Sequence, residues 1–408
     1  MLKKLQNNKV FVFCLLVPFF KPEILKYIAP VMDYLFNIFR ILSAGIAIML
    51  YFYSVKTRES ICFLGLLFSW QFLMLLSAIV NKKDIRDCIV TMLTIMSVCI
   101  LTETCIKVNA YIFFNSLFAL LFIEILINFI GIVIRPNGLA VGDYYYYPVH
   151  FLTIDNQLSP YMILAVVISI IYMQYTQKIL LPFILIVLIW MTMLILWSAT
   201  GIVGLVCCFA LIMLLKSNIM RELLNSFVLY FFLGIFNLFV FLVGLHNQIF
   251  ESLLAYLGKD ATLSGRTVMW KQAFSLIKSR ILLGYGPSEA HGYVFWHGKY
   301  FYTHNMILEI MIRGGIFSII IYMLMILYVG FVLYKYRTKR VTTVIMAGII
   351  ANFVTLVTEA YIYAVPVFVV YMLAININQI LQQTEQQSEI RTAFKLKVPR
   401  VKIITRKR

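Results

Sequence analysis

Charged side chains are scarce in this sequence. Only 13% of its 408 residues are Asp, Glu, Lys or Arg, whereas 62% are hydrophobic and the mean hydropathy is +0.92. This polar surface is too small to cover a water-soluble globule, so a soluble fold is excluded. The apolar runs are far longer than a strand and lack the alternation of barrel strands, so helices must satisfy the backbone. The sequence predicts an all-α integral membrane protein.

Metal and nucleotide motifs are also missing. The seven cysteines show no CxxC pair and no Cys/His ligand spacing, which argues against a structural metal and a disulfide framework. There is no Walker loop, and Gly284-Tyr285-Gly286 lacks the third glycine of a dinucleotide site. We therefore expect no metal and no cofactor.

Roughly twelve apolar runs have the length of about 20 residues that crosses a bilayer. They cover residues 9–29, 35–55, 61–80, 88–106, 110–134, 153–174, 179–197, 199–215, 226–245, 305–333, 341–363 and 366–382. Lys21-Pro22-Glu23 interrupts the first run, so we expect a kinked or partly re-entrant element there. The runs divide the chain into an N-terminal membrane bundle (1–245), an extracytoplasmic loop (246–304), C-terminal membrane helices (305–383) and a basic cytoplasmic tail (384–408).

The formal net charge of +18 can indicate either a nucleic-acid partner or a membrane orientation. Basic residues gather at the ends that the positive-inside rule assigns to the cytoplasm. They include Lys216, Arg221, Lys335, Arg337, Lys339, Arg340 and the tail from Arg391 to Arg408. We therefore expect no nucleic acid, both termini in the cytoplasm and a tail against anionic membrane lipids. Lys82, Lys83 and Arg86 fall on an outer loop and do not fit this rule.

Two loops stand out on the expected outer face, at 135–152 and 246–304. The first carries four consecutive tyrosines, Tyr144 to Tyr147, between Asp143 and Pro148. Such a run is typical of an aromatic belt at the membrane interface. It also suits a stacking surface for sugar rings, because tyrosine combines an apolar face with a hydroxyl. Both interpretations stay open.

The second loop contains a predicted amphipathic helix that lies in the membrane interface. Ser264 is its expected N-cap, and an apolar face follows, formed by Trp270, Ala273, Phe274, Ile277 and Ile281. Arg266 precedes Trp270 by four residues and therefore lies at the end of this apolar face. A cation there needs an anionic partner, unless it reaches lipid headgroup phosphates.

An aromatic and histidine-rich segment, with Tyr285 and Trp296 among its rings, follows this helix and ends at His304 and Asn305. In the next span Asn305, Glu309 and Arg313 are four residues apart, so they share one helical stripe. The order of Glu309 before Arg313 favours an ion pair. That pair either serves a site or only neutralises two charges in the membrane.

Together these residues resemble the signature loop and following helix of the O-antigen ligase and polymerase superfamily. The resemblance covers about residues 260–320 and rests on Ser264-Gly265-Arg266, Trp270, Gly284-Tyr285-Gly286, His304-Asn305, Glu309 and Gly314-Gly315. Asp155-Asn156-Gln157 and Thr358-Glu359 are similar to further family features. At Ser198-Ala199-Thr200-Gly201 many relatives carry an arginine that this chain lacks, so another residue fills its role or the role is dispensable.

The resemblance implies a metal-independent, inverting glycosyltransferase in the bacterial plasma membrane, acting on undecaprenyl-diphosphate-linked oligosaccharides at the outer leaflet. Arg266 is the first candidate to grip the diphosphate, because its planar guanidinium binds phosphate oxygens bidentately. His304 is assigned to the acceptor hydroxyl, since the helix dipole disfavours imidazolium there. The same helix end attracts phosphate, so His304 on the diphosphate stays an alternative. Candidates for substrate binding are Arg280, Arg313, Asn305, Glu309, Trp270, Tyr285 and Trp296.

The prediction from the sequence is a polymerase of lipid-linked repeat units that builds an O-antigen or capsular polysaccharide. Its expected partners are the lipid-linked oligosaccharide, membrane lipids, and a chain-length regulator and flippase of the same pathway. A ligase that transfers finished glycan to a terminal acceptor is the nearest alternative. A polysaccharide flippase is the alternative from another class, although the internal repeats typical of transporters are not evident.

Overall fold

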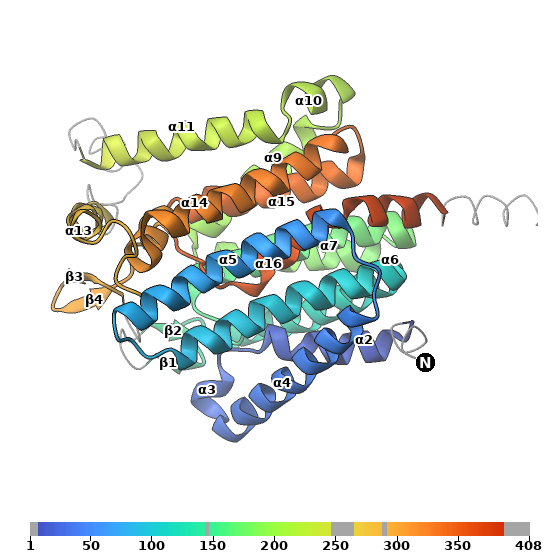
Figure 1. The fold of residues 1–408 in the computed structure, drawn as a ribbon. Helices are drawn as coiled ribbons and strands as arrows, with labels where there is room; N and C mark the ends of the chain where they lie inside the picture. The colour runs from blue at the N-terminus through green and yellow to red at the C-terminus, as the bar shows by residue number, and fades with distance from the viewer. Residues whose placement is uncertain (1–6, 143–146, 246–264, 288–291, 387–408) are drawn as a thin grey trace, which may run out of the picture.

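The computed structural model describes residues 7–142, 147–245, 265–287 and 292–386, and these form helices with two short hairpins (Figure 1). The helices of the first part are α2 (Lys9–Leu16), η1 (Val17–Phe20), α3 (Leu25–Ile28), α4 (Pro30–Phe52), α5 (Arg58–Val80) and α6 (Arg86–Ile134). After these come η2 (Asp155–Leu158), α7 (Ser159–Thr176), α8 (Leu180–Ile195), α9 (Ala199–Leu214), α10 (Asn218–Leu223) and α11 (Ser226–Leu245). The last are α13 (Arg266–Ser279), α14 (Met306–Lys335), α15 (Arg340–Leu356) and α16 (Val365–Ile375). Strands β1 (Ala140–Val141) and β2 (Pro148–Val149) pair antiparallel, as do β3 (Val294–Trp296) and β4 (Lys299–Phe301).

The predicted class of helical membrane protein is confirmed. Among the described residues, five helices are long and apolar enough to cross a bilayer, or six if α16 and the bent helix after it count as one span. Five further apolar helices have between 10 and 17 residues. The count of about twelve spans stays a prediction.

Breaks in the helices follow local chemistry. The first run is interrupted at Lys21-Pro22-Glu23, as expected, between η1 and α3. Within α6, Asn109 leaves the helical conformation at φ −161° and ψ 94°, and its side chain accepts the N–H of Ile112. This break separates the two runs predicted at 88–106 and 110–134.

The run predicted at 341–363 is wrong in its last part. Helix α15 ends at Leu356, and the segment from Val357 to Ala364 is irregular. Pro366 then stands in the first turn of α16, the helical position where a missing N–H does no harm, so the chain begins a new helix there. Glu359 is therefore a loop residue rather than a helical one.

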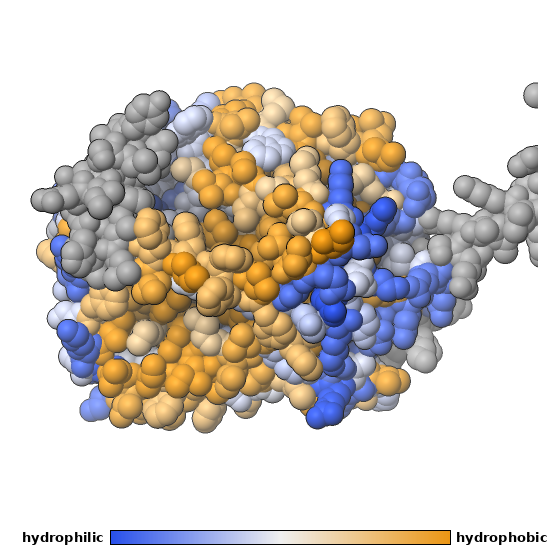
Figure 2. Space-filling view, turned by 90° about the horizontal axis from the view of Figure 1, so that it is seen from above, coloured by the Kyte–Doolittle hydropathy of each residue, from blue (hydrophilic) through white to orange (hydrophobic). Residues whose placement is uncertain are grey.

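The hairpins and α13 lie at one end of the bundle (Figure 1). Figure 1 shows α3, both hairpins and α13 at the left, whereas α10 and the N-terminus lie at the right. In Figure 1 helix α13 is seen end-on, whereas α5, α11 and α14 are seen lengthwise. The axis of α13 is therefore roughly perpendicular to the axes of these helices. Figure 2 shows a broad apolar surface between hydrophilic ends, as a protein surrounded by lipid requires.

Two glycines fix the turn after α13 against a kink in α14. Gly284 has φ +66°, and a Cβ there would lie 2.3 Å from the carbonyl oxygen of Ile312. Gly315 has φ +69°, and its Cβ would lie 2.1 Å from the carbonyl oxygen of Leu282. Only glycine permits this approach. Backbone bonds then join Tyr285 N–H to Ile312 O (2.7 Å), Gly286 N–H to Arg313 O (2.9 Å) and Ile316 N–H to Ile281 O (2.8 Å).

Candidate functional site

A fully buried carboxylate joins segments that are distant in the sequence. Glu359 Oε1 accepts hydrogen bonds from Asn156 Nδ2 at 2.9 Å and from a terminal nitrogen of Arg266 at 2.8 Å. Its Oε2 lies 3.2 Å from His304 Nδ1. We call these four residues the Glu359 cluster. It brings two predicted catalytic residues, Arg266 and His304, onto one anion.

Arg266 is positioned by the predicted amphipathic helix, which the structure confirms as α13. Trp270, Ala273 and Ile277 are buried against α14, and this contact fixes the helix on the bundle. The helix begins after Gly265, at φ +83°; Ser264, the expected cap, lies outside the described residues.

The structure supplies a protein carboxylate as an anionic partner for Arg266. The guanidinium uses one terminal nitrogen for Glu359. Its other terminal nitrogen and Nε donate to no acceptor among the described residues. A guanidinium has five N–H donors, so several stay available to a ligand.

His304 is held from both sides in an uncommon backbone conformation, φ +50°. On one side Thr303 donates its N–H and its hydroxyl to Glu309 Oε2, at 2.8 and 3.0 Å. On the other side Asn305 caps α14 by accepting the N–H of Leu308, and it donates to Val357 O at 2.9 Å. Positive φ in a residue with a side chain persists only where its surroundings enforce it, as they do here.

Glu359 also selects the tautomer of His304. An ionised carboxylate can only accept, so Nδ1 carries the proton that points to Oε2. The lone pair of the neutral ring is then on Nε2. The ring therefore has the arrangement of a base whose other nitrogen is held by a carboxylate.

Three tyrosines surround the Glu359 cluster. The Tyr302 ring packs on His304 with ring centroids 4.3 Å apart, and the Tyr361 hydroxyl donates to Asn156 O at 2.7 Å. Burial raises the pKa of Tyr302, Tyr361 and Tyr147 above the usual value, and the Glu359 carboxylate raises it further. These hydroxyls stay protonated and can donate hydrogen bonds at physiological pH.

Other predicted site residues support this geometry from outside the cluster. Glu309 and Arg313 form the expected ion pair, 2.7 Å between Oε1 and Nε. Trp270 is fully buried and donates to Thr303 O at 2.9 Å. Trp296 packs on Gly265, where a Cβ would lie 2.6 Å from the indole. Each of these contacts helps to position Arg266 or His304.

Arg280 and Tyr285 lie elsewhere. Arg280 bonds Asn81 in the connection after α5, and its guanidinium carbon lies 4.7 Å from the centroid of the Tyr285 ring. Neither residue has a contact with the Glu359 cluster within the described ranges. Their predicted part in substrate binding stays a prediction.

A family model described as O-Antigen ligase matches residues 157–323. This confirms the predicted resemblance to the O-antigen ligase and polymerase superfamily. Members of this family are glycosyltransferase-like enzymes, and the several membrane-capable helices agree with a multi-pass membrane protein. No curated protein and no solved structure matches the chain.

The range matched to the O-antigen ligase family includes Arg266 and His304 but neither Asn156 nor Glu359. The sequence pointed to these two residues only through short motifs. One signal was available for Glu359, since an ionisable side chain inside a predicted span marks a functional site by default. Arg40, in the run predicted at 35–55, is a second ionisable side chain of this kind.

The arginine expected from the resemblance is missing from the start of α9, where Ser198 and Thr200 lie beside the Glu359 cluster. Ser198 Oγ lies 3.4 Å from Asn156 Oδ1, and the hydroxyls of Thr200 and Thr358 are 3.2 Å apart. Tyr144 to Tyr146 lie outside the described residues. The choice between a membrane belt and a sugar surface for the tyrosine run therefore stays open.

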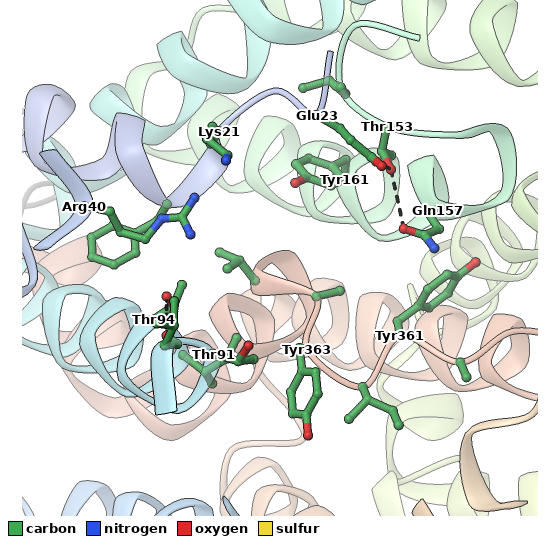
Figure 3. A pocket seen from close by; sticks show the side chains of 18 of the residues that line it. Lys21, Glu23, Arg40, Thr91, Thr94, Thr153, Gln157, Tyr161, Tyr361 and Tyr363 are labelled. Carbon is green, nitrogen blue, oxygen red and sulfur yellow. Dashed lines mark hydrogen bonds between the residues drawn. The ribbon is translucent and has the colours of Figure 1, made fainter. Parts of the chain in front are cut away.

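Two cavities with no lining residue in common flank this region. One, of about 600 Å³, is lined by charged, hydroxyl and apolar side chains, Tyr302 among them. Figure 3 shows Tyr361 at one side of it. The other, of about 440 Å³, lies between α11, α14 and α15 and is almost wholly apolar. Met306 and Ile307, just after His304 and Asn305, line this second cavity.

Proposed function

We propose that the chain is a glycosyltransferase that polymerises undecaprenyl-diphosphate-linked oligosaccharide repeat units into O-antigen or capsular polysaccharide at the outer leaflet. The observation that carries this proposal is the shared anion: Glu359 holds a histidine in the tautomer of a base and an arginine with free donors side by side. The O-antigen ligase match supports the reaction class.

The proposed reaction is an inverting transfer without a metal. The acceptor hydroxyl attacks the anomeric carbon of the donor, the bond from that carbon to the diphosphate oxygen breaks, and the diphosphate leaves. His304 Nε2 takes the hydroxyl proton. The free N–H groups of Arg266 stabilise the charge that develops on the departing diphosphate.

The apolar cavity between α11, α14 and α15 suits the isoprenoid tail of the donor. It begins at Met306 and Ile307 and continues along α14 to Met323, Ile326 and Leu327. A tail in this cavity would bring its diphosphate to the end where His304 and Arg266 lie. The lipid-linked nature of the donor therefore agrees with the position of the cavity.

The test is the product that purified protein makes from lipid-linked repeat units alone. A polymerase makes a ladder of longer lipid-linked chains. A ligase makes no longer chains until a terminal acceptor is added, and a flippase forms no glycosidic bond. In cells, deletion of the gene should leave single repeat units on the surface; unattached long polymer would identify a ligase instead.

The diphosphate role of Arg266 has its own test. Arg266→Lys keeps the charge but loses the bidentate fork, so we expect donor binding and polymer formation to fall about tenfold or more. Arg337→Lys, at the opposite end of the bundle, is the matched control and should have no effect. If normal amounts of Arg266→Lys make full-length glycan, the proposed role of Arg266 in binding the diphosphate is wrong.

A further inference from the structure

The polar cavity beside the Glu359 cluster extends beyond that cluster. Its volume is about 600 Å³, and it extends from Tyr302 and Tyr361 to the N-terminal segment and α4. Figure 3 shows Gln157 and Tyr361 at one side of it and Arg40 and Lys21 at the other. A ligand that fills it would therefore reach from the Glu359 cluster to a cationic end.

Arg40 is an unusual residue at that cationic end. It lies in the membrane-capable helix α4, whose neighbouring side chains Phe39, Ile41 and Leu42 are exposed. Its side chain instead points into the cavity (Figure 3). Arginine inside a membrane span is costly unless it faces water, a partner or a ligand.

The hydrogen bonds of Arg40 leave most of its donors free. Nε donates to Pro18 O at 3.0 Å. Within the described ranges, its two terminal nitrogens bond no acceptor and no carboxylate lies within 4.0 Å of them. The guanidinium is thus fixed by one bond and presents its planar end to the cavity, which is the geometry that binds phosphate oxygens bidentately.

Four cations and three acids line the cavity, and Asp33 is shared, since it interacts electrostatically with Arg40 as well as with Lys21. Lys21 pairs with Asp33 at 2.5 Å, and Arg313 pairs with Glu309 at 2.7 Å. The third acid on the wall, Glu23, accepts the hydroxyl of Thr153 at 2.5 Å. Lys26 adds one more cation to the lining. The cavity therefore has a net positive charge, which favours an anionic ligand.

A repeat-unit polymerase needs a second anion site, because both of its substrates carry a diphosphate. The donor diphosphate must lie where its bond breaks, beside Arg266. The acceptor attacks through a hydroxyl of its distal sugar, so its own diphosphate lies one repeat unit away. Between the two ends, the cavity offers hydroxyl and amide groups for sugars, from Thr91, Gln157, Tyr161 and Tyr361.

We propose that Arg40, with Lys21 beside it, is a second diphosphate subsite that holds the acceptor repeat unit while its distal sugar reaches His304. This inference rests on the proposed polymerase function. It gives Arg40 a specificity role: the enzyme extends chains only onto an acceptor that carries its own lipid diphosphate.

The first experiment counts bound diphosphates without any reaction. Purified protein in uncharged phosphatidylcholine nanodiscs is titrated with a polyprenyl diphosphate that lacks sugar. Wild type should bind two equivalents. Arg40→Gln should weaken one of them by about tenfold to a hundredfold, the range for a charge-assisted hydrogen bond. Arg58→Gln, an exposed arginine at the start of α5, is the control and should bind two.

Competition identifies the source of the anion. Inorganic diphosphate should displace the Arg40-dependent equivalent, whereas phosphatidylglycerol at the same concentration should not. Displacement by phosphatidylglycerol would mark a general headgroup site and overturn the proposal. One equivalent in wild type, or two unchanged equivalents in Arg40→Gln, would overturn it as well.

Kinetics then separate the two substrates. With a long-chain donor and a single repeat unit as acceptor, Arg40→Gln should raise the acceptor KM about tenfold or more and leave the donor KM unchanged. Arg40→Lys should recover part of the acceptor affinity, and size-exclusion profiles exclude misfolding as the cause. An equal rise in both KM values contradicts the subsite. If wild type binds two equivalents but forms no polymer, the proposed function fails and the subsite does not.

Discussion

Two buried glutamates, Glu309 and Glu359, lie on either side of His304, and each is paired with an arginine. Glu309 holds the backbone before the histidine through Thr303, and its arginine is four residues further along the same helix. Glu359 holds the histidine ring itself, and its arginine is 93 residues away in the chain. Glu309 therefore fixes the position of the His304 backbone, and Glu359 fixes the tautomer of the His304 ring.

The partners of the two glutamates differ in where they come from in the chain. Arg313 bonds Glu309 through Nε from the next turn of α14, so this pair lies within one helix. Arg266 reaches Glu359 from α13, and the same carboxylate also holds Asn156 and His304. The first pair forms locally, whereas the second carboxylate depends on three segments that meet at the site. Substitutions around each glutamate test whether the two carboxylates have different roles.

The largest effect is expected at His304. Loss of a general base typically costs about a hundred- to ten-thousand-fold in rate, so His304→Ala should leave single repeat units while donor binding survives. His304→Asn tolerates positive φ and should be equally inactive, which separates chemistry from strain. His297→Asn, at an exposed turn with φ +47°, is the control. The measurement is an assay with purified protein. Normal polymerisation by His304→Ala would disprove the role of His304 as a general base. Loss of donor binding would show instead that His304 binds the diphosphate.

A smaller loss, about ten- to a hundredfold, is expected for Glu359→Gln, by analogy with carboxylates that orient a metal-ligating histidine. The amide has one acceptor oxygen, whereas Asn156, Arg266 and His304 all donate to this side chain, so one donor must face an NH2 group. Combining it with Arg266→Gln should not restore polymer formation. Glu222→Gln, in an exposed pair at the other end, should have no effect. If polymer formation recovers in the double variant, Glu359 serves only to neutralise the charge of Arg266.

Glu309 should behave in the opposite way. Removing one partner of a buried ion pair typically lowers the free energy of unfolding by about 3–5 kcal/mol. Glu309→Gln alone should therefore lower the amount of inserted protein. Adding Arg313→Gln should restore both insertion and most of the activity, since the amide oxygen can still accept from Thr303. The measurement is membrane abundance together with glycan length. A stable but inactive double variant would show that one of the two residues acts in the site.

The smallest effect is expected at Trp270, which supports the His304 backbone indirectly. Trp270→Phe loses the bond from the indole to Thr303 O, and a net loss of about 1 kcal/mol in the free energy of unfolding is typical for one buried hydrogen bond. Thermal unfolding in detergent measures it. Trp190→Phe, whose indole nitrogen bonds no acceptor among the described residues, should shift the transition less.

Local spacing was enough to predict several parts of this molecule. The amphipathic helix at Arg266, the Glu309–Arg313 pair and the break at Lys21-Pro22-Glu23 each depend on residues within a few positions of one another. Their physics is the periodicity of one helix or the missing N–H of one proline. Such features are visible in a sequence because no distant partner is needed to form them.

The Glu359 cluster could not be predicted in the same way. Glu359 meets Asn156 across 203 residues and Arg266 across 93, so its geometry depends on how the helices pack. The early end of α15 removed Glu359 from the predicted span and placed it in an irregular segment. Arg40 needed the same information, since its sequence shows a cation in a span but not the cavity into which it points.

The contact between Gly284 and Gly315 has a mechanical consequence. At the kink, Ile316 N–H bonds Ile281 in place of Ile312, and Ile312 O accepts from Tyr285 instead. Lifting α13 and its turn away would leave these groups unpaired beside lipid, at several kcal/mol each. Helix α13 is therefore held rigidly against α14 rather than free to open over the site.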